Sequence, residues 1–222
     1  MVFRVIGNKL YQIKAKIQDE DEFIKKNKTL KLIKVALQEL PVYSGEEVDE
    51  VFYALDNDGN IIIDTDRTSQ RITEYKEERK QQYLDRLIDF CDKKTQEIQD
   101  YLNGQKVTEG LIMRYEAKEA MAQAYLKDGS FKDELQVEAD LKGVTVDELA
   151  KLITTLANEY KTKLNYFYSL IEAFRVKSKT LVLNYKFNEF DSIIYKATAF
   201  GATTTANDIK SLFDEIDSEN RE

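Results

Sequence analysis

The hydrophobic residues of this chain change their spacing near residue 68. Before that point, apolar and polar residues alternate in short runs, which is the period of a strand with one buried face. From Thr68 onward, apolar residues recur every three or four positions with charged residues between them, which is the period of an amphipathic helix. The pattern predicts an α+β fold with a small N-terminal antiparallel β domain, a mainly helical C-terminal region and a long connecting helix. The predicted division is 1–68 for the β domain, 69–200 for the helical domain, and 201–222 for a hinge and a terminal amphipathic helix.

Short alternating runs place the strands of the β domain. Strands are predicted at residues 3–6 and 9–17, joined by a Gly-Asn turn, and in a second hairpin across residues 51–64. The stretch 30–40 fits either a strand or a helix and is assigned as a strand ending before Pro41. Residues 19–22, all acidic, fit a linker or the start of a helix. These strands suffice for a small sheet with one buried face.

The stretch LDNDGNIIID, residues 55–64, contains the oxygen ligands that calcium prefers. Placing Gly59 at the sixth position of a twelve-residue calcium loop puts Asp56 and Asp58 at its third and fifth positions. The first and last positions, which supply the strongest ligands, then carry Ala and Thr. The flanking runs are β-branched and aromatic, so a tight hairpin turn is favoured over a metal loop. A calcium-regulated binder or a carboxylate-dependent enzyme remains the alternative, built on Asp56, Asp58, Asp64 and Asp66.

Helix signals divide the second region. The first helix is predicted over residues 72–102 and ends at Asn103-Gly104, and the second covers 108–126. The third runs from Ser130 to Gly143. Thr145 and Glu148 form a capping box for a fourth helix that extends to about residue 175, and residues 179–199 add one or two shorter helices.

The fourth predicted helix is rich in aromatic residues, which suggests the hypothesis that nucleic-acid bases stack on them. At helical spacing they lie on one face, which favours core packing: Tyr160, Leu164, Phe167, Ile171 and Phe174.

The last segment begins with a low-complexity stretch at residues 201–207 and continues as a short amphipathic helix. This helix either folds back on its own domain, docks in a groove of a partner, or is disordered. Its apolar stripe supplies candidate partner-binding residues: Ile209, Leu212, Phe213 and Ile216.

Composition removes several classes of function. The net charge of −8 argues against general nucleic-acid binding, and no apolar run is long enough for a membrane span. The chain has no histidine, so the usual general base and zinc ligand are absent, and no phosphate-binding glycine loop is present. The lone cysteine, Cys91, lies on an apolar helical stripe and is predicted to be buried, with a nucleophile as the alternative. We expect no catalytic residues, cofactor or metal, and no signal peptide, so the expected location is the cytoplasm.

The helical region resembles the C-terminal part of phage tail-fibre and tail assembly chaperones. The similarity covers about residues 75–197 and rests on spaced segments: MRYEAKEA at 113–120, residues 135–139, KGVTVDELAKLI at 142–153, Tyr160, and IEAFR at 171–175. The hairpin at residues 55–61 also suits this family. The tryptophan content common in the family is absent, and the terminal helix lies outside the pattern.

The resemblance implies a non-enzymatic protein that binds a phage tail fibre in the host cytoplasm and assists its folding and trimerisation. Aggregation-prone strand edges in the fibre are the hazard that such a chaperone covers. The β domain is the expected docking surface, through edge pairing or through the candidates Tyr43, Phe52 and Tyr53. The alternative is a structural component that remains on the fibre tip or baseplate of the virion tail.

Overall fold

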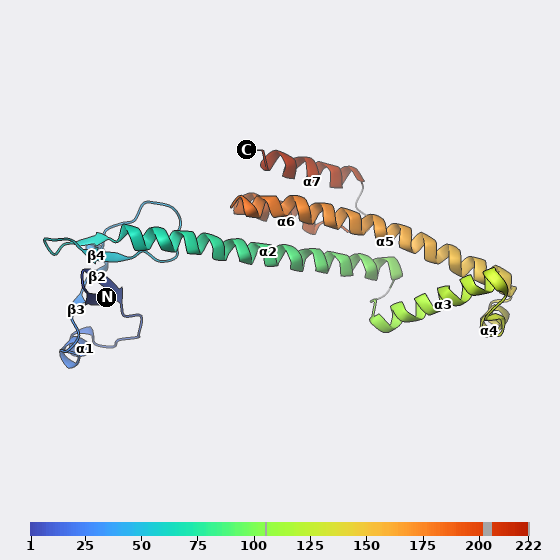
Figure 1. Ribbon diagram of the computed structural model, residues 1–222, viewed down its shortest axis with the longest axis horizontal. Coiled ribbons are helices and arrows are strands. Elements are labelled where there is room, and N and C mark those ends of the chain that lie inside the picture. Colours follow the sequence, from blue (N-terminus) through green and yellow to red (C-terminus); the bar gives the residue numbers. More distant parts are fainter. Residues whose placement is uncertain (105, 202–205, 222) are drawn as a thin grey trace. The chain divides into compact units, whose positions relative to one another are not determined.

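A computed structural model describes residues 1–104, 106–201 and 206–221 (Figure 1). The chain consists of two compact units, Met1–Gln81 and Gln82–Glu222. A small antiparallel five-stranded sheet occupies the N-terminal part, and a mostly helical region with one long helix follows it. The predicted fold class is confirmed.

The sheet unit has the strand order β3-β1-β2-β4-β5, with every neighbouring pair antiparallel. Its strands are β1 (Val2–Ile6), β2 (Lys9–Gln12), β3 (Leu32–Lys34), β4 (Tyr53–Leu55) and β5 (Ile61–Ile63). Phe3 lies opposite Gln12 of β2 and Ile33 of β3, so β1 is the centre of the first three strands. β4 joins β2 through the pair Leu10 and Tyr53.

Alternation along the strands gives the sheet one apolar face. The buried core on this face comprises Phe3, Val5, Leu10 and Val35. Half-buried apolar side chains surround it: Met1, Ile33, Leu40, Tyr53, Leu55 and Ile61. The short helix α1 (Glu20–Lys26) begins at Asp19, whose carboxylate accepts the backbone N–H groups of Asp21 and Glu22 at 3.0 Å each. The acidic stretch 19–22 is therefore a helix start.

Two predicted strands are shorter in the structure than the alternation suggested. The strand predicted at 9–17 ends at Gln12, level with the beginning of its partner strand β1, where Ile13 donates to Val2 O at 2.9 Å. The strand predicted at 30–40 is limited to Leu32–Lys34, and a turn of 3₁₀ helix, η1 (Leu37–Glu39), follows it. Alternation marks which residues can form a strand, but a strand needs a partner along its whole length.

The long helix is α2 (Thr65–Asn103). It starts earlier than the predicted residue 72 and ends at the predicted Asn103-Gly104, where Gly104 has φ of 64°. The boundary between the two compact units falls inside this helix, after Gln81.

Three further helices form one part of the second unit: α3 (Glu109–Asp128), α4 (Lys132–Lys142) and the N-terminal part of α5 (Val146–Leu183). Their shared core combines three alanines, which allow close helix approach, with larger aliphatic side chains: Ala122, Ala139 and Ala150, with Leu135, Val146 and Leu149. The predicted capping box is present, since Glu148 donates its backbone N–H to Thr145 Oγ1 at 3.2 Å and accepts the backbone N–H of Thr145 at 2.9 Å.

The rest of the second unit is organised around the C-terminal half of α5. The fourth helix does not end at residue 175 as predicted but continues to Leu183, because residues 176–183 contain no Gly or Pro and bury Leu181 and Val182 completely. The helices that follow are α6 (Phe187–Thr198) and α7 (Ala206–Glu219). Their common core includes Leu87, Cys91, Phe174, Phe190, Ile193, Leu212 and Ile216. Of the predicted hinge at 201–207, residues 202–205 lie outside the described part of the chain.

Candidate functional site

The Asp56 loop is a hairpin turn whose carboxylate is fully engaged by the turn itself. Asp58 and Asn60 donate their backbone N–H groups to Asp56 Oδ1 at 2.9 and 2.8 Å, and Asn60 Nδ2 donates to Oδ2 at 3.0 Å. These hydrogen bonds, the Asn60 side chain first, hold the pKa of Asp56 below its usual range. Gly59 has φ of 86°, a conformation that glycine adopts readily. The loop joins β4 to β5, so the hairpin interpretation is confirmed.

The other two acidic residues of the calcium alternative have separate surroundings. Asp64 accepts the backbone N–H of Arg67 at 3.1 Å in the first turn of α2, and Asp66 is exposed in the same turn. Within the described ranges, no group of three or more His, Cys, Asp or Glu side chains is placed to hold a metal ion.

The three aromatic candidates of the β domain do not form one exposed patch. Tyr53 points into the sheet core, where its ring meets Phe3 edge-on with centroids 6.3 Å apart. Tyr43 is half-buried in the loop before β4, and its side chain lies against Gly45. Phe52 is half-buried and donates its backbone N–H to Thr68 Oγ1 at 3.1 Å.

Phe52 shares a cation–π site that the alternation pattern did not reveal. The guanidinium carbon of Arg67 lies 4.3 Å from the Phe52 ring centroid and 4.5 Å from that of Tyr11. Arg67 Nη1 donates to Leu10 O at 3.4 Å and lies 3.6 Å from Asp64 Oδ2. A cavity of about 100 Å³ is next to this group, lined by Phe3, Leu10, Tyr11, Gln12, Glu50, Val51, Phe52, Tyr53 and Arg67.

Tyr11 and Arg67 are therefore the site residues that sequence reasoning missed. In the alternating run at residues 9–17, Tyr11 belongs to the apolar set, but the structure leaves it 41% exposed and buries its neighbour Leu10 instead. Arg67 stands three residues after Asp64, the acidic residue directly before α2. No pattern in the sequence shows that the side chains of Tyr11 and Arg67 meet.

Strand β5 forms an edge of the sheet, and its hydrogen-bonding geometry follows from the hairpin. Asp64 donates to Phe52 O and Asp56 donates to Asn60 O, each at 2.9 Å, so the residues of β5 that bond toward β4 are the even-numbered ones. The backbone N–H and C=O groups of Ile61 and Ile63 consequently point away from β4. In the part of the chain that the structure describes, β5 pairs with β4 alone.

The opposite edge of the sheet is strand β3, and helix α1 packs next to it. Lys34 of β3 pairs with Asp21 of α1 at 3.2 Å, and its hydrogen bond and charge interaction with Asp21 raise the pKa of Lys34. A charged side chain and a neighbouring helix are two ways in which proteins protect a sheet edge. Of the two edges, β5 is the one better suited to accept another strand.

An acidic loop before β4 is bound to the first turns of α2. Asp49 accepts hydrogen bonds from Arg71 Nε at 2.9 Å and Nη2 at 2.7 Å, and Arg71 also binds Glu78 at 2.7 Å. Arg79 pairs with Glu47 at 2.7 Å. The hydrogen bonds from Arg71 lower the pKa of both Asp49 and Glu78. This loop precedes Phe52, so its attachment to α2 positions the start of β4.

The residues that carry the family resemblance serve helix packing. Lys118 of α3 donates to Glu138 of α4 at 2.7 Å, and Glu119 of α3 accepts from Lys161 of α5 at 2.7 Å. Glu119 is only 8% exposed and also accepts from Gln123 at 2.9 Å. The Lys-Glu pair of the segment MRYEAKEA thus holds α3 to both of its neighbours.

The terminal helix α7 folds back on its own unit, which was the first of the alternatives. Ile209, Leu212 and Ile216 are buried, and Phe213 packs against the same core. The four candidate partner-binding residues of this helix therefore face inward in this structure.

The aromatic stripe of α5 and the cysteine also lie inward. Phe174 is buried, the other stripe residues are half-buried, and Tyr160 Oη accepts a hydrogen bond from Asn103 Nδ2 at 2.9 Å. Cys91 is 4% exposed, and burial raises the pKa of its thiol to about 11, so the thiol stays protonated at neutral pH.

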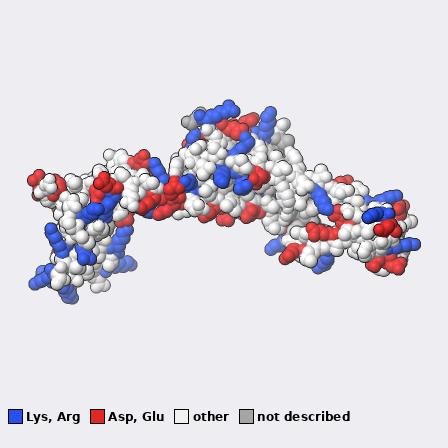
Figure 2. Space-filling model, viewed as in Figure 1, with Lys and Arg blue, Asp and Glu red and all other residues white. Residues whose placement is uncertain are grey.

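Charge is mixed over the surface. Figure 2 shows Lys and Arg gathered around α1 and interspersed with Asp and Glu elsewhere on the face in view. Within residues 1–104, 106–201 and 206–221, none of the helices combines the length and apolar character needed to cross a bilayer.

Comparison with known proteins gave no relative. No family model, no curated protein and no solved structure matches this chain.

Proposed function

We propose that this chain is a non-enzymatic phage tail-fibre assembly chaperone that binds the fibre protein and assists its folding and trimerisation. The observation that carries the proposal is the outer edge of β5, in a sheet that belongs to its own compact unit. The resemblance of the helical region to tail assembly chaperones supplies the class of partner.

The proposed mechanism is strand addition. An unfinished fibre subunit exposes unpaired strand edges until its neighbours arrive, and these edges promote aggregation. The outward N–H and C=O groups of Ile61 and Ile63 can pair with such an edge without any change in the chaperone sheet. A three-residue edge makes few hydrogen bonds, so binding is weak enough for the fibre to leave when it trimerises.

The test is co-expression of a tail-fibre gene from the same genome with variants of this edge. Ile63→Pro removes one outward N–H while leaving the bonds to β4, because Ile63 bonds away from β4. Ile63→Ala trims the same side chain and keeps the N–H, so it is the matched control. We expect the wild type and I63A to raise the yield of soluble fibre trimer, and I63P to lose most of this effect.

The proposal is wrong if the wild-type chain leaves fibre solubility and trimer yield unchanged. Equal activity of I63P and the wild type would support the chaperone function but show that the fibre binds at a surface other than β5.

A further inference from the structure

The surface beneath α7 is a groove shaped for an amphipathic helix. Leu212 and Ile216 of α7 enter the core between α5 and α6 and are 4% and 0% exposed. They pack against a floor of Phe174, Leu181, Val182, Phe190, Ile193 and Ala197. This is the arrangement of a helix in a groove, with the helix supplied by the chain itself.

The rim of this groove is basic where α7 is acidic. Lys177 of α5 pairs with Asp217, and Lys196 of α6 pairs with Glu215. Lys186 donates to the backbone oxygen of Glu219 in the last turn of α7. Charge complementarity of this kind selects an acidic helix and sets its direction in the groove.

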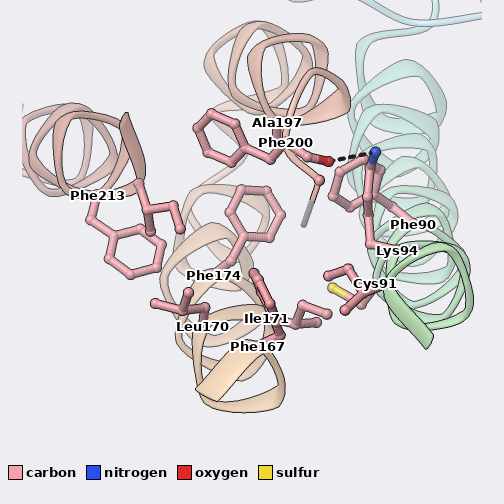
Figure 3. Close-up of a pocket in the computed structure, with 13 residues that line it drawn as sticks. Phe90, Cys91, Lys94, Phe167, Leu170, Ile171, Phe174, Ala197, Phe200 and Phe213 are labelled. Atoms are coloured by element: carbon pink, nitrogen blue, oxygen red, sulfur yellow. Dashed lines mark hydrogen bonds between the residues drawn. The ribbon is translucent and has the colours of Figure 1, made fainter. Parts of the chain in front are cut away.

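The fit of α7 is incomplete at one end. A cavity of about 60 Å³ remains beside Ile209 and Phe213, which are four residues apart and so share one face of α7. Figure 3 shows Phe174 and Ile171 of α5, Phe90 and Cys91 of α2, and Phe213 of α7 around this space. Its wall is almost wholly apolar, which leaves too few polar groups to hold an ordered water.

Lys94 of α2 lines the cavity as well. Its ammonium group donates to Thr198 O at 2.8 Å and to Phe200 O at 2.9 Å, the latter drawn in Figure 3.

Polar atoms near the end of α7 add to the imperfect fit. Ser178 Oγ and Asn220 Oδ1 are buried and have no hydrogen-bond partner among the described residues. Asn220 Nδ2 makes one long bond, 3.4 Å, to the backbone oxygen of Lys177. Buried polar atoms without partners weaken an interface.

We propose that the groove between α5 and α6 is a docking site for an acidic amphipathic helix of a partner protein, and that α7 is its resident competitor. The partner helix pairs with Lys177, Lys186 and Lys196 and fills the cavity with a side chain larger than that of Ile209. This inference rests on the helical unit alone and does not depend on the strand-addition function proposed for β5.

The experiment uses the full chain and two labelled synthetic peptides, one with the sequence of residues 206–221 and one carrying Ile209→Phe. The double variant Leu212→Asp/Ile216→Asp loosens α7 without changing the groove. By fluorescence anisotropy, we expect both peptides to bind this variant, and the I209F peptide to bind about tenfold more tightly than the native sequence. Reversing the charge of the groove rim with Lys177→Glu and Lys196→Glu in the same variant should weaken the binding of both peptides at least tenfold.

Three results would overturn the proposal: no peptide binding to a loosened variant that keeps its helical circular dichroism, equal affinity of the two peptides, or no effect of charge reversal. A wild-type chain that sediments as a dimer, with the loosened variant a monomer, would assign the groove to α7 of a second copy instead.

A second measurement applies if the loosened variant does not fold. Hydrogen exchange of the wild-type chain in excess I209F peptide should become faster in α7, because the peptide displaces it. Unchanged exchange in α7 at saturating peptide would contradict a displaceable competitor.

Discussion

At the scale of single residues, charged side chains hold together elements that are distant in the sequence. Glu119 is the clearest case, since a carboxylate that is 8% exposed is neutralised by Lys161 from another helix. Lys161 itself is about half exposed, with 54% of its side chain accessible, so only one of the two partners is desolvated. Such a pair is sensitive to loss of the exposed partner, because the buried charge then remains without compensation.

We expect Lys161→Met to lower the free energy of unfolding by about 1–2 kcal/mol, less than the roughly 3–5 kcal/mol found for fully buried pairs. The double variant Glu119→Met/Lys161→Met should recover most of that loss, because it removes the buried charge as well. Urea unfolding followed by helical circular dichroism checks both. A single variant as stable as the wild type would show that Glu119 needs no cation.

The ion pairs of Arg71 lead to a second prediction at the residue scale, on how stability depends on pH. The folded-state pKa values of Asp49 and Glu78 lie below their unfolded values, so the stabilisation they give is complete above the unfolded values and is lost as pH falls through the folded ones. The acidic loop should therefore stay attached to α2 at neutral pH and detach below about pH 4.

The variant Arg71→Gln isolates this effect. In an NMR titration of the side-chain carboxyl groups, the pKa of Asp49 should return toward its ordinary value of about 3.9 in the variant. Asp56, which is held by Asn60 and not by Arg71, is the internal control and should not move. An unchanged Asp49 would mean that Arg71 is not the source of its lowered pKa.

At the scale of elements, start and stop signals decide where most of the helices lie. The Thr145 cap and Gly143, with φ of 67°, define the junction between α4 and α5 where the sequence places it.

We expect Thr145→Ala to cost about 1 kcal/mol of stability, because Glu148 loses the side-chain acceptor of its backbone N–H. Thr155→Ala is the matched control, since Thr155 is exposed in the interior of the same helix and alanine is the better helix former. Thermal unfolding should place T145A below the wild type and T155A at or above it. The reverse order would exclude capping as the role of Thr145.

The elements that sequence reasoning located least well are those fixed by distant partners. The hairpin at residues 55–61 and the end of α2 carry their own turn residues and were predicted correctly. The end of β2 depends on where β1 begins, and the length of α5 depends on the burial of Leu181 and Val182 by helices that come later. The candidate site shows the same limit, because Phe52 was found from its residue type while Arg67 and Tyr11 are joined to it only by the fold.

At the scale of the whole molecule, the chain is organised as two compact units whose boundary lies inside one continuous helix. The helical period does not change at that point, so no feature of the sequence marks it. Each unit carries its own proposed binding surface, the β5 edge in the first and the α7 groove in the second.

The most direct test of the assembly function is affinity purification of the tagged chain from a host in which the phage genes are induced. The wild type, I63A and I63P are compared, and mass spectrometry identifies the proteins that co-elute from the lysate and from finished particles. The account predicts a tail-fibre protein with the wild type and with I63A in the lysate, strong depletion with I63P, and no chain on finished particles. A lysate without any fibre protein would contradict the function, and the chain at fixed stoichiometry on particles would make it a structural component.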